Sequence, residues 1–133
     1  MSETVTVTLE IGSEATGGIA AANDYYAAHG QDGEWRLEKA YFCPQITTAL
    51  HADDYASMEL FQGYSGSSTA IATAMTTQTV AFTVGTVREF TLSENSSREF
   101  GPTDTLFCDL NEAGTFTAGM RGAIVCRFRK IRA

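Results

Sequence analysis

Residues 102–131 read PTDTLFCDLNEAGTFTAGMRGAIVCRFRKI, and this stretch decides the fold class of the 133-residue chain. Apolar and polar side chains alternate in both halves, which is the period of a β-strand and not of a helix. The side chains that share a face are Leu106, Cys108 and Leu110 in the first half and Ile124, Cys126 and Phe128 in the second. Gly114 and Gly119 lie between the halves, where the chain must turn. The stretch therefore predicts two strands that close the fold as a hairpin.

The same alternation recurs along the chain, separated by turn residues at a spacing of roughly ten residues. It predicts further strands at residues 4–11, 34–43, 55–62, 80–84 and 87–92. The side chains expected to share a face are Trp35, Leu37, Lys39 and Tyr41 in residues 34–43, and Ala56, Met58 and Leu60 in residues 55–62. They are Val80, Phe82 and Val84 in residues 80–84, and Phe90 and Leu92 in residues 87–92. We predict an all-β protein, an antiparallel β-sandwich or jelly roll of about seven or eight strands.

The N-terminal third leaves two alternatives open. Residues 1–12 form either a strand or an extended arm, with Val5, Val7 and Leu9 on one face. Residues 13–33 form either a long loop or a short helix, which the alanine-rich sequence places at residues 19–28. Residues 34–131 form the sandwich core, and residues 1–133 are expected to be one domain.

Charge is unevenly distributed along the chain. Sixteen acidic and four basic residues give residues 1–120 a charge of −12, whereas residues 121–133 carry +5, for a total of −7. The acidic majority argues against a nucleic-acid partner. The basic end is expected to contact an acidic protein surface or a second copy of this chain. The candidate cations are Arg121, Arg127, Arg129, Lys130 and Arg132.

The three cysteines, Cys43, Cys108 and Cys126, are too few and too scattered for a disulfide scaffold. Each lies in an apolar strand pattern, so we expect reduced thiols in the core. No run of apolar residues is long enough to span a membrane, and no signal-peptide pattern is present. These features predict no membrane partner and synthesis in a cytoplasm.

The sequence contains no motif that predicts catalysis. A G-x-S-x-G motif and a phosphate-binding glycine loop are absent. His51, Asp53 and Asp54 lie close together, but a loop with ordinary turn chemistry explains them better than a metal site. His29 is expected at the surface or at a helix cap. We expect no enzyme activity, no metal and no cofactor.

Aromatic residues allow a second functional class. Side chains that could stack on a sugar are Trp35, Tyr41, Tyr55 and Tyr64. Large aromatics more often serve packing, in the core or at a subunit contact. A carbohydrate-binding or host-adhesion module on the same architecture is therefore the alternative hypothesis.

The order of features over residues 34–131 resembles a known group, the small capsid cement or decoration proteins of tailed-phage heads. The resemblance begins with WRLEKAYFCP (35–44), HADDYASMELF (51–61) and GSSTAIATAMTTQTVAFTVG (66–85). It continues through FTLSENSSREF (90–100), GPTDTLFCDL (101–110) and AGTFTAGMRGAIVCRFRK (113–130). These are strand and turn cues rather than a fixed signature.

This resemblance implies a structural role on the outer surface of a virion. Its implied partners are the major capsid protein of the same virus and the chain itself, as a homodimer or homotrimer. The protein would be made in the host cytoplasm. From the residues themselves, the contact candidates are the five basic residues of the C-terminal end together with Val5, Val7 and Leu9.

Overall fold

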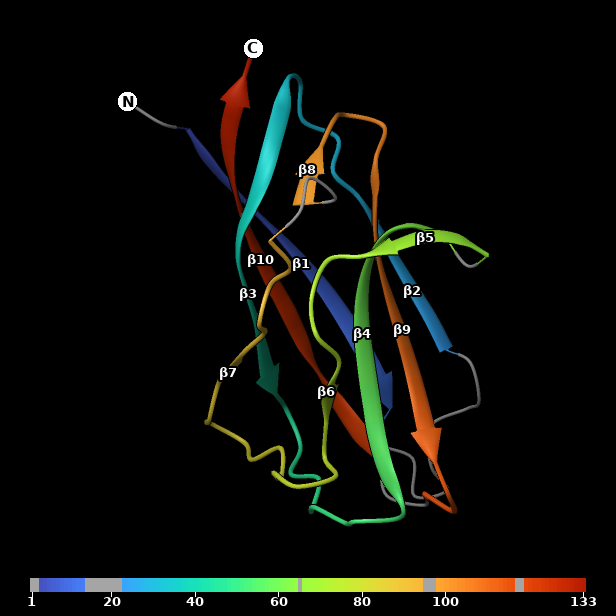
Figure 1. Cartoon of the computed structure of the whole chain (residues 1–133). Helices are drawn as coiled ribbons and strands as arrows, with labels where there is room; N and C mark the ends of the chain where they lie inside the picture. Colours follow the sequence, from blue (N-terminus) through green and yellow to red (C-terminus); the bar gives the residue numbers. More distant parts are fainter. Residues whose placement is uncertain (1–2, 14–22, 65, 95–97, 117–118) are drawn as a thin grey trace.

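Two antiparallel β-sheets pack face to face in the computed structural model, which forms a β-sandwich (Figure 1). The structure describes residues 3–13, 23–64, 66–94, 98–116 and 119–133. The predicted all-β antiparallel sandwich is confirmed. Within the described residues the strands number ten rather than seven or eight, because four of them, β5 to β8, are only two to four residues long.

Each sheet contains five strands. The first sheet has the order β1 (Thr4–Ser13), β10 (Met120–Arg132), β3 (Glu34–Pro44) and β7 (Arg88–Glu89), and β8 (Glu99–Phe100) also pairs with β3. The second sheet has the order β2 (Asn23–Ala28), β9 (Thr105–Ala113), β4 (Tyr55–Tyr64) and β5 (Ser67–Ala70), and β6 (Met75–Thr76) also pairs with β4.

The two C-terminal strands lie where the alternation places them, but they do not form a hairpin. β9 pairs with β2 and β4, whereas β10 pairs with β1 and β3 in the other sheet. Their inward side chains are buried and face the same core from opposite sheets: Leu106, Cys108, Leu110, Ile124, Cys126 and Phe128. Each strand therefore buries its apolar face in the shared core from its own sheet. The residues between β9 and β10 connect the two sheets and do not form a hairpin turn within one sheet.

Residues 4–13 form a strand and not a free arm. β1 pairs with β10 along its whole length, from Thr4 opposite Arg129 to Ser13 opposite Met120. Leu9 and Ile11 are buried, and Val5 and Val7 are partly buried against the same core.

The predicted helix at residues 19–28 is wrong over its second half. Residues 23–28 form β2, which pairs with β9 from Asn23 opposite Leu110 to Ala28 opposite Thr105. Residues 19–22 lie outside the described residues. Tyr25 and Ala27 pack against the core, so a period of two and an available sheet edge outweigh the helix propensity of alanine.

A β-bulge in β3 overturns the strict alternation predicted for residues 34–43. The register between β10 and β3 shifts between Arg127 and Phe128, so Glu38 and Lys39 are both half-exposed. Trp35 and Leu37 are buried before the bulge, and Ala40 and Phe42 are buried after it. Such an extra residue reverses the phase of the pleat, which is why Lys39 and Tyr41 do not join Trp35 on the inner face.

Residues 80–84 do not form the predicted strand. Phe82 is fully buried and makes a single bridge to Thr48, while Val80 and Val84 are about half exposed. For residues 87–92 only Arg88–Glu89 is a strand, although Phe90 is buried and Leu92 packs against the core as predicted. Among the described residues, no helix is long and apolar enough to cross a membrane.

The cysteine thiols are free, as expected, but only two of them are buried. Burial raises the pKa of the Cys126 thiol to about 12 and also raises the pKa of Cys108. Cys43 is partly exposed, since it lies beyond the bulge on the outer face of β3. Two cysteines therefore act as small apolar core residues.

Deleting residues 1–12 should unfold the protein rather than leave an intact sandwich. The deletion removes Thr4 to Gly12, all but the last residue of the strand that pairs with β10. It also removes Leu9 and Ile11, and each such side chain contributes about 1.5–3 kcal/mol when buried, against a total stability of about 5–15 kcal/mol. Thermal unfolding followed by circular dichroism should show no cooperative transition. Deleting only residues 2 and 3 is the control, and cooperative unfolding of the longer deletion near the wild-type temperature would show that β1 is dispensable.

Candidate functional site

The outer face of the second sheet carries a row of three aromatic side chains. Tyr26, Phe107 and Phe61 are directly opposite one another on β2, β9 and β4. The ring centroids of Tyr26 and Phe107 are 4.8 Å apart with an interplanar angle of 11°, and those of Phe61 and Phe107 are 5.4 Å apart at 28°. We call these residues the aromatic strip.

Phe107 shows how unusual this strip is for a solvent-facing surface. Its neighbours in sequence, Leu106 and Cys108, face the core, so its own ring projects outward. It is nevertheless only 2% exposed, and the rings of Tyr26 and Phe61 stack against it from the neighbouring strands. Tyr26 is 46% exposed at the end of the strip. An outward Phe107 follows from the alternation of the sequence, since Leu106 and Cys108 share the inner face, but none of the three aromatic residues was predicted as a site residue.

Three carboxylates form a second row beside the aromatic strip. Asp24 on β2, Asp109 on β9 and Glu59 on β4 are directly opposite one another, two residues along from the aromatic strip. Desolvation and the neighbouring Asp109 carboxylate raise the pKa of Asp24. Like charges directly opposite each other on adjacent strands destabilise a sheet. This acidic row therefore adds repulsion to the fold that a basic partner surface would relieve.

The first sheet presents the opposite charge on its outer face. Arg127 and Arg129 project outward from β10, and both approach Glu38, at N–O distances of 3.5 and 3.6 Å. The bulge in β3 places this carboxylate between them, and it directs Lys39 to Glu89 at 3.2 Å. One carboxylate for two guanidinium groups leaves the cluster positive, and such exposed ion pairs add little stability of their own.

The other predicted basic contact residues do not join this cluster. Arg132 forms an ion pair with Glu99 at 2.7 Å, and the Lys130 ammonium lies 5.7 Å from the centroid of the Trp35 ring. Arg121 is partly buried near the start of β10, far along the strand from Arg129. Val5, Val7 and Leu9 face the core rather than the outer surface.

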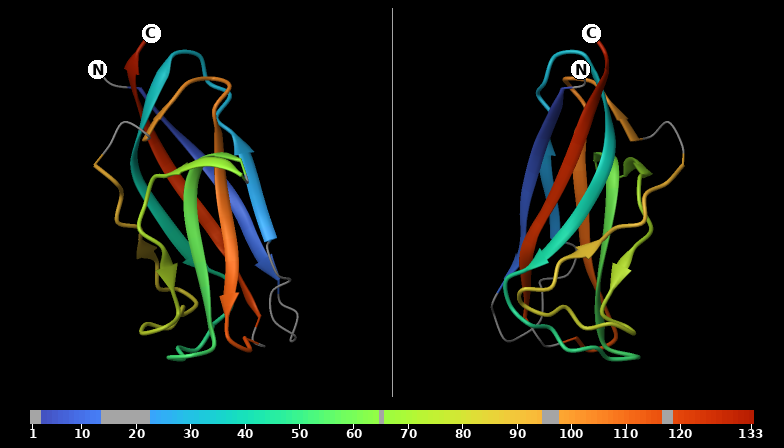
Figure 2. Two further views of the ribbon diagram at one scale, coloured as in Figure 1. Left: turned by 45° about the vertical axis from the view of Figure 1, so that its right-hand side comes forward. Right: turned by 90° about the vertical axis from the view of Figure 1, so that its left-hand side faces the viewer.

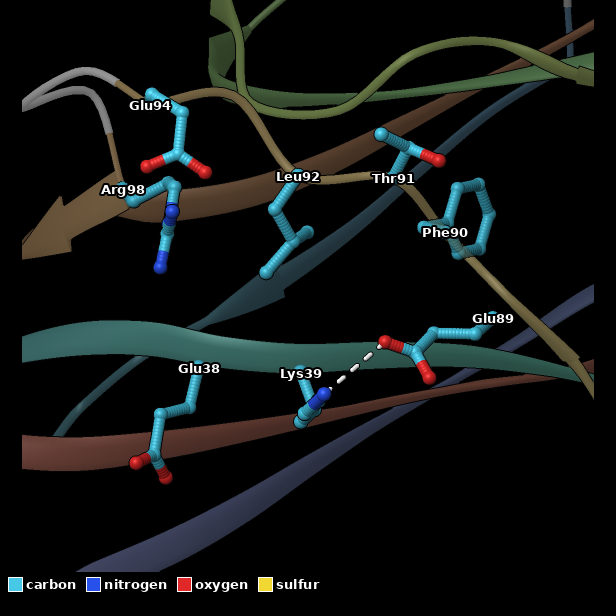
Figure 3. A pocket seen from close by; sticks show the side chains of 8 residues that line it. All are labelled: Glu38, Lys39, Glu89, Phe90, Thr91, Leu92, Glu94 and Arg98. Carbon is cyan, nitrogen blue, oxygen red and sulfur yellow. Dashed lines mark hydrogen bonds and ion pairs between the residues drawn. The ribbon is translucent and has the colours of Figure 1, made fainter.

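A polar groove of about 390 Å³ adjoins the basic face (Figure 3). Its walls carry Glu38, Lys39, Glu89, Phe90, Thr91, Leu92, Glu94 and Arg98. Arg98 anchors one wall, since its Nε donates to the Leu37 carbonyl at 3.0 Å and its Nη1 to the Ser93 carbonyl at 2.8 Å. The groove therefore has charges of both signs and a fixed wall, but the sequence analysis gave no indication of it.

The residues nominated for sugar stacking do not form one platform. Trp35 is 4% exposed, and its Nε1 donates to the Asp32 carbonyl at 2.9 Å. Tyr41 lies on the first sheet, whereas Tyr55 and Tyr64 lie at opposite ends of β4 in the second. Only Tyr64, at 62%, is strongly exposed.

His51 organises a turn. Its Nδ1 accepts hydrogen bonds from the backbone N–H groups of Asp53 and Asp54, at 3.1 and 2.8 Å. The Asp54 carboxylate in turn accepts from the Thr115 N–H at 2.7 Å. Turn chemistry thus explains these residues, and no cluster that could hold a metal occurs among the described residues.

His29 is buried, which contradicts the expectation of a surface or cap residue. It is 4% exposed, and its ring centroid is 4.6 Å from that of Phe128, 5.7 Å from Trp35 and 5.9 Å from Phe100. Neither ring nitrogen has a hydrogen-bond partner among the described residues. Burial lowers the pKa of His29, against an opposing effect of the Asp104 carboxylate. A neutral histidine is therefore part of the core.

No family model matches this chain, and no curated protein matches it. One similar solved structure is a chain from Desmodium yellow mottle tymovirus, with 10% sequence identity and a TM-score of 0.37, over 100% of this chain and 82% of that one.

The free energy of unfolding should decrease as the pH falls below about 6.5, the unfolded-state pKa of histidine. In that range the unfolded chain takes up a proton at His29 that the folded chain excludes, whereas above it both states are neutral. Uptake of this one proton changes the free energy of unfolding by at most about 1.4 kcal/mol per pH unit. Urea unfolding at several pH values measures it.

The variant His29→Phe should lose this part of the pH dependence. His29→Phe keeps an aromatic ring against Phe128, Trp35 and Phe100, so the wild-type protein measured at the same pH values is its reference. Equal pH profiles for wild type and His29→Phe would contradict the assignment.

Proposed function

We propose that this chain is a structural protein of a virus particle, a cement or decoration protein that binds the outside of a tailed-phage shell and stabilises it. The resemblance over residues 34–131 motivates the choice of partner. The observation that carries the proposal is the aromatic strip with its neighbouring acidic row, on the outer face of the second sheet.

The aromatic strip has the composition of a protein contact. Aromatic side chains are enriched at interfaces, where they bury large areas at low entropic cost. Tyr26 offers one exposed ring beside a strip that is already ordered by stacking. A partner would therefore contact chiefly the Tyr26 ring, which is held in place by stacking on Phe107, and would need little reorganisation to bind it.

The acidic row adds negative charge to this contact. Asp24, Asp109 and Glu59 lie next to one another across three strands, so a basic partner surface would relieve their mutual repulsion. Such complementarity steers docking and fixes its register more than it raises affinity. We infer that the capsid surface under the second sheet is apolar with a basic margin.

The basic cluster on the first sheet gives the protein a second contact of opposite sign. Arg127 and Arg129 lie on the opposite side of the sandwich from the acidic row. A sandwich with both contacts can bridge two different surfaces at a seam of a shell. Binding only to the assembled lattice stabilises that lattice by mass action.

Protein contact is favoured over the carbohydrate alternative by the arrangement of the rings. Sugar stacking requires an open ring face, but both faces of Phe107 are covered by its neighbours. The four nominated aromatic residues are dispersed over both sheets and the core.

Tyr26→Ser should weaken binding to empty shells of the phage that encodes the chain by roughly thirtyfold, the effect of losing about 2 kcal/mol at an aromatic hot spot. Co-sedimentation with the shells measures the affinity. Tyr64→Ser is the matched control, because Tyr64 is exposed but lies outside the aromatic strip. Failure of the wild-type protein to bind the shells, or an equal loss in both variants, would overturn the proposal.

Reversing both charges of the basic cluster, Arg127→Glu with Arg129→Glu, should also reduce shell binding. The reduction should be largest at low ionic strength, because salt screens exposed charges. Circular dichroism checks that the fold survives the added repulsion with Glu38. Unchanged binding at every salt concentration would show that the basic cluster is only a solvated face.

A further inference from the structure

β1 leaves one edge of the first sheet open in the described part of the chain (Figure 2). The right-hand view shows β1, β10 and β3 side by side, with β1 at the outer edge. β1 pairs with β10 over ten residues without a register shift. It contains no lysine and no proline, and Glu10 is its single charge. β1 itself thus lacks the lysine and proline side chains that usually protect a free edge from pairing.

Two hydrogen bonds determine which backbone groups of β1 point outward. The Lys130 N–H donates to the Glu3 carbonyl at 2.9 Å, so the odd-numbered residues of β1 direct their backbone groups toward β10. The Gly12 N–H, by contrast, donates away from β10 to the Tyr25 hydroxyl at 3.0 Å. The residues whose N–H and C=O groups face the open edge are therefore Thr4, Thr6, Thr8 and Glu10.

We propose that a second copy of this chain pairs with this edge, β1 antiparallel to β1, around a twofold axis at Val7. One register uses the outward groups of these four residues: Thr4 opposite Glu10 of the second copy, and Thr6 opposite Thr8. Each such pair exchanges two hydrogen bonds, which gives roughly eight in all. The two first sheets then form one continuous sheet.

The inner face supports the same register. Val5 and Val7 are only partly buried, although they face the core. In the pair, Val7 lies opposite Val7 of the second copy, and Val5 lies opposite Leu9. The apolar row at the rim of each sandwich is thereby covered by the rim of the other, which adds hydrophobic stabilisation.

Charge complementarity on the outer face supports the same register. Thr4 has Arg129 opposite it on β10. The register places Glu10 of the second copy on the other side of Thr4, so the two charges are two strand spacings apart, about 9.6 Å between Cα atoms. Long side chains span this distance, and the twofold axis creates the interaction twice. The edge is thus complementary to itself, which favours a second copy over an unrelated strand.

Disulfide trapping tests the register directly. In the pair, the two Val7 residues form a non-hydrogen-bonded site with Cα atoms about 4.5 Å apart, within disulfide range. Val7→Cys in a Cys43→Ser background should therefore give a covalent dimer under mild oxidation. Val5→Cys is the matched control, because its two copies would be about 14 Å apart.

Sedimentation velocity without any shell measures the dimer itself, so its failure is distinct from failure to bind a capsid. Glu10→Lys should weaken the dimer by roughly tenfold, since two attractive contacts become repulsive, and adding Arg129→Glu should restore it. A monomeric wild-type protein, equal cross-linking at positions 5 and 7, or no rescue by the second charge reversal would overturn the proposal.

Discussion

The pairing of β10 on both of its sides is the interaction on which the rest of the structure depends. This thirteen-residue strand pairs with β1 on one side and with β3 on the other. Its inward side chains Ile124, Cys126 and Phe128 are fully buried. Its outward side chains Arg127 and Arg129 form the basic cluster. One strand thus supplies the centre of the first sheet, part of the core and one of the two charged surfaces.

Sequence periodicity was sufficient where a strand has one buried and one exposed face. It identified β4, β9 and β10 and their inward residues, because a period of two is a local property of the chain. It failed where long-range pairing decides the outcome. The bulge at Glu38 and Lys39 reverses the phase of β3 through its register with β10, and β2 forms from an alanine-rich segment because β9 offers it an edge.

The candidate site was harder to predict for the same reason. Tyr26, Phe107 and Phe61 are far apart in sequence and meet only through the strand order of the second sheet. Phe107 at an outward position of an alternating strand was the available signal. The basic end was visible as a cluster in sequence, but only Arg127 and Arg129 approach a common partner, Glu38. Arg121 lies near the other end of β10, and Arg132 and Lys130 interact with Glu99 and Trp35.

The surfaces of the molecule have different chemical characters. The second sheet presents apolar rings beside carboxylates, and the first sheet presents guanidinium groups. Within the described residues, no strand pairs with the outer edge of β1 in the first sheet. Each suits a different protein contact: a basic shell surface, an acidic one and a second copy. This division of the surface supports the proposed role as a shell-binding structural protein.

The most direct test of that role is electron cryomicroscopy of empty phage shells incubated with the protein. The account predicts added density on the outer surface, with the aromatic strip and the acidic row of the second sheet facing the capsid. Absence of added density, or density that contacts the shell only through other surfaces, would contradict it.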